Sequence, residues 1–163
     1  MWIKKPKDIT KQQGIAFGTM DGVVNVLGVL LSLSIATGSK TAVITGVLAA
    51  GLANALANSS GFYVSEETTG LYTERQIIFA TITAFLSSFG SALLVLLPTF
   101  IFDLTAGLWS GFFIGIIMLF VIGYAFSYAD KRRAIIIGIK YVSIGLIVSA
   151  IGFTLGLIVD RFI

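Results

Sequence analysis

One acidic residue, Asp21, lies inside a long apolar stretch of this sequence. A charged carboxylate in the middle of a bilayer costs at least about 2.5–3.5 kcal/mol, so such a residue faces protein or water and commonly serves as an ion or proton site. At helical spacing, Asp21 shares one face with small and polar residues, namely Gly14, Gly18, Asn25 and Gly28. We therefore predict an ion or proton site at Asp21. A structural ion pair with Lys140 is the alternative.

A second stripe of small and polar residues follows later in the chain. At helical spacing it contains Gly51, Asn54, Asn58, Gly61 and Ser65. If the two stripes face each other, Asp21, Asn25, Asn54 and Asn58 supply oxygen atoms that can ligate a metal ion. The alternative is that the asparagines only hydrogen-bond between helices and the glycines only allow close packing.

A short acidic segment over residues 65–76 adds two further candidate metal ligands, Glu66 and Glu67. Carboxylates at the mouth of a pathway concentrate cations by electrostatic attraction. A solvated loop at the membrane surface explains the same residues without any binding role.

The absence of histidine and cysteine limits the chemistry of any site. An ion site must then consist mainly of oxygen ligands, which suits Mg²⁺, Mn²⁺ or Fe²⁺, and also Na⁺ or protons. The sequence contains no nucleophile–base pair, no phosphate-binding loop and no zinc signature. We therefore predict that the protein is not an enzyme and holds no cofactor, with a metal ion as cargo.

Composition indicates the elements that position these residues. The chain is 56% hydrophobic and only 12% charged, whereas soluble domains are about 45–50% apolar and about 25% charged. Five apolar stretches are long enough for a bilayer core, which needs about 20 helical residues. We predict an all-α membrane protein, with one transmembrane domain over residues 1–163 and helices over 14–36, 41–64, 77–102, 106–129 and 134–159.

Basic residues between the apolar stretches predict the orientation. One side would carry Lys4, Lys5, Lys7, Lys11, Arg75, Lys131, Arg132 and Arg133; the other would carry only Lys40 and Arg161. Because cytoplasmic loops are enriched in Lys and Arg, we predict a cytoplasmic N-terminus and a C-terminus outside or in a lumen. The net charge of +3 thus reflects membrane topology, and we predict no nucleic-acid partner.

Several segments resemble the vacuolar iron transporter family. They are Asp21-Gly22-Val23-Val24-Asn25-Val26-Leu27-Gly28, then Ala49-Ala50-Gly51-Leu52-Ala53 through Gly61-Phe62-Tyr63-Val64-Ser65, and Ala84-Phe85-Leu86-Ser87-Ser88-Phe89-Gly90 with Pro98. The resemblance implies a five-helix homodimer in the bilayer that exports Fe²⁺ or Mn²⁺ from the cytosol in exchange for protons. It places Asp21 at the family's membrane carboxylate.

Three departures accompany this resemblance. The family usually has methionine at the position of Asn58 and glutamate at the position of Phe62. Its plant-type members also insert a glutamate-rich metal-binding domain where this chain has only residues 65–76. Three hypotheses follow: a metal/proton antiporter, a relative that carries another cation or solute, and a membrane assembly protein without transport activity.

Overall fold

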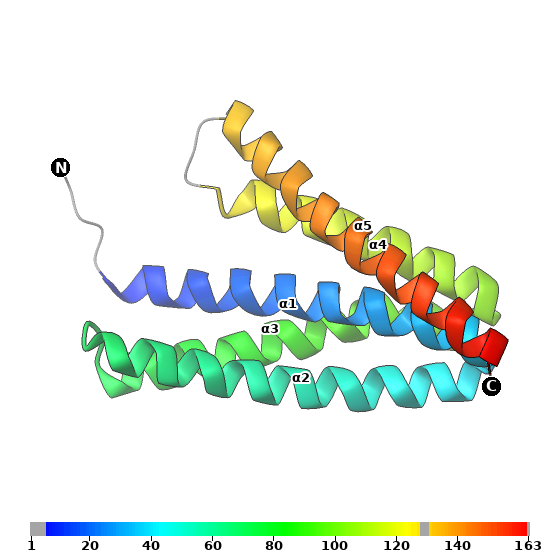
Figure 1. The fold of residues 1–163 in the computed structure, drawn as a ribbon. Helices are drawn as coiled ribbons and strands as arrows, with labels where there is room; N and C mark the ends of the chain where they lie inside the picture. The colour runs from blue at the N-terminus through cyan, green and yellow to red at the C-terminus, as the bar shows by residue number, and fades with distance from the viewer. Residues whose placement is uncertain (1–5, 128–130, 163) are drawn as a thin grey trace.

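The protein consists of five long helices over the residues that the structure describes. This computed structural model describes residues 6–127 and 131–162, with side chains in the first helix described from Gln12 onward. All five helices are long and apolar enough to cross a membrane, so the predicted all-α, five-helix fold is confirmed. The helices are α1 (Pro6–Thr37), α2 (Lys40–Thr69), α3 (Glu74–Ile101), α4 (Leu104–Ala125) and α5 (Lys131–Phe162) (Figure 1).

Local sequence explains where these helices begin and end. Side chains satisfy free N–H groups at two helix starts: the Ser39 hydroxyl accepts from the Ala42 N–H, and the Asp103 carboxylate from the Ala106 N–H, both at 3.3 Å. Gly70 ends α2 with a φ of 64°, a left-handed conformation that glycine adopts without strain. Asp103 is thus a helix cap at the turn between α3 and α4.

Some predicted boundaries were wrong. The chain remains helical to Thr69, so Glu66 and Glu67 lie on α2, where the sequence analysis expected a loop. The helix predicted over 77–102 was one residue too long at its C-terminal end, because Phe102 has an extended backbone. The stretch 106–129 also ran too far, because α4 ends at Ala125; residues 128 and 129 lie outside the described residues.

Helix α1 lies at the centre of the bundle and packs against all four other helices. Helices α2 and α3 lie along one side of it, and α4 and α5 form a second pair (Figure 1). The core consists of branched aliphatic side chains from α1 to α4, with Val26, Leu27 and Leu30 of α1 fully buried. The two groups of helices lie close where α1 ends and diverge towards the start of α1 (Figure 1).

Glycines of α1 bring its backbone directly against α3. A Cβ atom on Gly14 would lie 2.6 Å from the carbonyl oxygen of Ala80. A Cβ on Gly18 would overlap the carbonyl oxygen of Ala84 in the same way. The stripe of Asp21 was considered above as facing the polar stripe of α2. For Gly14 and Gly18 that placement was wrong, because α3 covers both residues.

The outward surface of the bundle is strongly apolar. Large side chains such as Leu86, Ile117 and Ile147 are about 60% exposed, at 62%, 62% and 60% respectively. Exposed apolar patches of this extent are rare on soluble proteins. They are expected where lipid covers the surface, so the protein is an integral, multi-pass membrane protein that associates with a lipid bilayer.

Candidate functional site

Asp21 lies where α1, α2 and α3 meet, and hydrogen bonds from two other helices hold its carboxylate. The amide nitrogen Nδ2 of Asn54 on α2 donates to Asp21 Oδ2 at 2.6 Å. The hydroxyl of Ser88 on α3 donates to the same oxygen at 3.3 Å. Asp21 is half-buried, and its partners are these neutral donors. The alternative of an ion pair with Lys140 is therefore wrong: Lys140 is exposed on α5.

A second asparagine extends this hydrogen-bonded cluster along α2. Asn58 Nδ2 donates to Asn54 Oδ1 at 3.1 Å, while Asn54 donates onward to Asp21. Each amide therefore donates in the same direction, towards the carboxylate. The structure thus brings together three of the predicted ligands, Asp21, Asn54 and Asn58. We call these three residues the polar chain.

One oxygen of the carboxylate is not used by the polar chain. Both hydrogen bonds end on Oδ2, and no hydrogen bond from the described residues reaches Oδ1. Within the described ranges, no three His, Cys, Asp or Glu residues come close enough to hold a metal ion together. One chain therefore offers a single carboxylate, one unengaged carboxylate oxygen and neighbouring amide groups.

An aromatic pair covers one end of the polar chain. Phe17 precedes Asp21 by about one helical turn, and Phe62 follows Asn58 by about one turn. Their rings stack between α1 and α2, with centroids 5.8 Å apart and an interplanar angle of 27°. This stack separates the polar chain from the end of α2 that carries the glutamates.

Glu66 and Glu67 lie well away from Asp21. They follow Asn54 on α2 by about three helical turns, or roughly 18 Å at 1.5 Å per residue. Glu66 is half-buried and Glu67 is exposed. The structure therefore does not bring these two carboxylates into the cluster around Asp21, and places them in the last turns of α2 instead.

Asn25 occupies a separate environment one turn beyond Asp21. Its Oδ1 atom is buried and has no hydrogen-bond partner among the described residues. The residue lines an open groove of about 570 Å³ between α2 and α5, with α1 as its floor. Its lining includes the small residues Gly46 and Ala50 of α2 and Gly152 of α5. Asn25 is thus a polar group without a partner beside an apolar groove.

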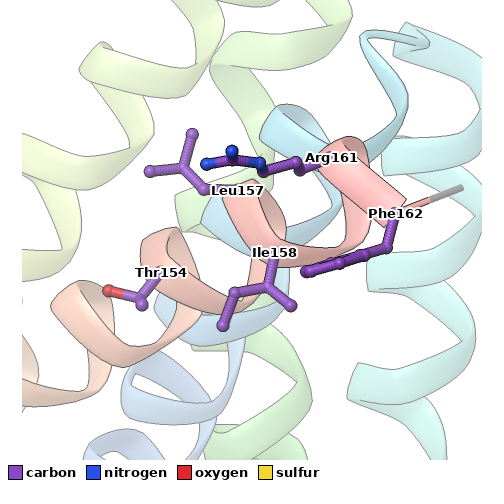
Figure 2. Close-up of a pocket in the computed structure, with 5 residues that line it drawn as sticks. All are labelled: Thr154, Leu157, Ile158, Arg161 and Phe162. Atoms are coloured by element: carbon purple, nitrogen blue, oxygen red, sulfur yellow. The ribbon is translucent and has the colours of Figure 1, made fainter.

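A smaller hollow lies near the C-terminal end of α5 and is not a strong candidate for a site. Figure 2 shows its five lining residues, all on that one helix: Thr154, Leu157, Ile158, Arg161 and Phe162. Because no second helix contributes to it, the hollow is part of the uncovered surface of α5.

Ser88 was missed as a site residue in the sequence analysis. A signal was nevertheless present, because Ala80, Ala84 and Ser88 recur at four-residue spacing and match Gly14, Gly18 and Gly22 on α1. Two small-residue stripes of the same spacing indicate close helix packing. That pairing would have placed Ser88 beside Asp21.

Comparisons with known proteins give one similar protein. No protein-family model and no solved structure matches the chain. The chain is 28% identical to a protein of Methanocaldococcus jannaschii with the name "Uncharacterized protein MJ0645", over 85% of each chain. The similarity therefore extends through most of both proteins, and the name of that relative states no activity.

Proposed function

We propose that this protein is a membrane transporter that moves a cation out of the cytosol in exchange for protons, with Asp21 as the exchange site. The observation that carries the proposal is the carboxylate of Asp21, half-buried within a bundle of membrane-spanning length, with Oδ1 unengaged. The expected cargo is Fe²⁺ or Mn²⁺, because the sequence resembles the vacuolar iron transporter family and has an oxygen-rich donor set.

Exchange at this site follows from competition for one carboxylate. A proton on Asp21 removes the negative charge that attracts a cation, and a bound cation opposes protonation. The amides of Asn54 and Asn58 fit both states, since rotation of the terminal amide presents its oxygen where its N–H₂ group was. They donate to an empty carboxylate and would ligate a bound ion.

A relative that carries a different cation is the second candidate. One support is that the polar chain contains a single carboxylate. The other is that Asn58 and Phe62 stand where the vacuolar iron transporter family usually has methionine and glutamate. A single negative charge balances a monovalent ion such as Na⁺ better than a divalent one. A membrane assembly protein without transport is the third candidate, supported by the two hydrogen bonds that already satisfy Asp21 Oδ2.

Flux measurements in proteoliposomes separate these candidates. The purified protein is reconstituted with a pH-sensitive dye, and Fe²⁺, Mn²⁺, Co²⁺, Zn²⁺ and Na⁺ are offered in turn. We expect Fe²⁺ or Mn²⁺ influx to be accompanied by proton efflux. Flux of Na⁺ alone would support the second candidate, and no flux of any ion above empty liposomes would refute a transport function for these cations.

Restoring the residues of the vacuolar iron transporter family at the Asn58 end of the polar chain should strengthen metal handling. We expect Asn58→Met with Phe62→Glu to raise Fe²⁺ flux or affinity by about tenfold or more, because a carboxylate supplies charge and a thioether suits a softer metal. Titration of Fe²⁺ uptake checks this, with Phe113→Glu on the outer face of α4 as the control. Unchanged uptake would show that the ion does not pass these residues.

We also propose that the protein forms a homodimer, with the groove between α2 and α5 at the interface. The support is the unpartnered Oδ1 of Asn25 beside this groove, because buried polar side chains favour helix association in membranes. Ala50→Trp should fill the groove and yield monomers in native mass spectrometry. Leu86→Trp, on the outer face of α3, should leave dimers; a wild-type monomer would contradict the proposal.

The proposed orientation places the N-terminus in the cytosol and the C-terminus outside or in a lumen. Its support is the excess of basic residues on one side of the predicted spans. A reporter fused after Ile163 should therefore read as non-cytoplasmic. A cytoplasmic signal there would contradict the orientation or the number of spans.

A further inference from the structure

The first turns of α5 carry a basic and apolar surface that no other described residue covers. Lys131, Arg132 and Lys140 are exposed, and none of the three makes an ion pair or hydrogen bond within the described part of the chain. Isoleucines lie between them, with Ile136 57% and Ile139 54% exposed. We call the surface of these five residues the basic face.

The length of α5 places the basic face at the membrane surface. Residues 141–159 carry no charged side chain and span about 28 Å at 1.5 Å per residue, which nearly equals the roughly 30 Å hydrocarbon core of a bilayer. Lys140 therefore lies at the edge of the core. Helix α5 begins at Lys131, nine residues before Lys140, so residues 131–139 extend from the edge of the core into the headgroup layer.

The register of the helix gathers these groups on one side. Arg132, Ile136 and Lys140 are spaced four residues apart, so they form one ridge along the helix surface. Both long basic side chains can extend their charged ends to the same headgroup level, since lysine and arginine keep their apolar stems in lipid and their charges at the interface. Ile136 lies between them and adds exposed apolar surface close to the edge of the core.

Nothing on the neighbouring helix neutralises this charge. Helix α4, which packs against this part of α5 through Gly123 and Gly138, has no acidic residue along its whole length. A surface with unpaired positive charge at headgroup depth and apolar side chains beside it matches the chemistry of an anionic phospholipid.

We propose that the basic face binds an anionic phospholipid, with its phosphate between Arg132 and Lys140, its glycerol end against Ile136 and Ile139, and its acyl chains passing into the hydrocarbon core beyond Lys140. This binding site is separate from the polar chain and is independent of whether the protein transports an ion. It predicts that anionic lipid remains bound after purification, while zwitterionic lipid of the same chain length does not.

Native mass spectrometry of protein released from nanodiscs tests the proposal. Nanodiscs contain phosphatidylcholine alone or an equal mixture with phosphatidylglycerol of identical acyl chains. We expect the parent protein to retain phosphatidylglycerol preferentially. The double variant Arg132→Gln with Lys140→Gln should reduce this preference about thirtyfold, since each basic residue near an anionic surface contributes a similar amount to the binding free energy. The control, Arg75→Gln with Arg161→Gln, also removes two positive charges and should retain the lipid.

Three outcomes of this lipid comparison would overturn the proposal. They are equal retention of both lipids by the parent protein, full retention by the Arg132/Lys140 variant, and equal loss in the control variant. Displacement of the lipid by excess inorganic phosphate would also overturn it, because phosphate shares the charge and lacks the acyl chains. Circular dichroism of both variants verifies that lost retention does not reflect unfolding.

Discussion

Asp21→Asn is expected to reduce proton-coupled cation flux to the level of empty liposomes. In the parent protein, Asn54 and Ser88 donate to Asp21 Oδ2 at 2.6 Å and 3.3 Å. Asparagine keeps the shape of the side chain, and its amide oxygen can accept the same two hydrogen bonds. It cannot bind or release a proton, and it offers a cation no negative charge. We therefore expect the variant to fold while losing both cargo attraction and proton exchange.

The stability of this variant separates a functional carboxylate from a structural one. A charged carboxylate within a membrane costs on the order of 2.5–3.5 kcal/mol, so its neutral counterpart should unfold at the same or a higher temperature. Asp160→Asn, the same change on an exposed residue of α5, should leave flux and unfolding unaltered. Parent-like flux with the same pH dependence in Asp21→Asn would show that Asp21 is not the exchange site.

Gly18→Ala should destabilise the bundle by about 1–3 kcal/mol, the usual range for overpacking a tight interface. The added Cβ would overlap the carbonyl oxygen of Ala84, and it would also lie 3.0 Å from the carbonyl carbon and 3.1 Å from the Cα of that residue. All three obstacles belong to the backbone of α3, so no side chain can rotate away. The helices must separate, which also moves Ser88 away from Asp21.

Gly61→Ala on α2 is the matched control. An added Cβ there meets nothing within 4 Å, and alanine in a helix interior is more favourable than glycine by about 0.5–1 kcal/mol. The unfolding temperature in detergent should therefore fall for Gly18→Ala, and should rise or stay the same for Gly61→Ala. Similar shifts in both variants would mean that the close approach of α1 and α3 does not limit stability.

The sequence predicted the fold well because the membrane constrains it. Only helices satisfy the backbone of a lone span in lipid, so the five apolar stretches sufficed to predict five helices. Helix ends were harder to place, since they depend on local caps. Gly70, with its φ of 64°, ends α2 later than the change from apolar to polar residues suggested.

The candidate site was predicted only in part, because residue spacing gives the face of a helix and not its neighbour. The stripe of Asp21 correctly placed it near Asn54 and Asn58, which the hydrogen bonds join. The same stripe wrongly suggested that Gly18 faces α2, whereas it lies against Ala84 of α3. Ser88 was missed because its signal is the matching four-residue spacing of small residues on α1 and α3, which becomes informative only when those two helices are compared.

The divergence of the two helix groups has a mechanical consequence. Helices α1 and α5 touch backbone to backbone at Gly28 and Gly152, and the start of α5 lies about 31 Å from that contact at 1.5 Å per residue. If the helices repack at this contact, α5 would act as a lever. A rotation of about 5° there would displace the far end of α5 by about 3 Å, given that lever length. A small change around two glycines would then become a much larger movement at the start of α5.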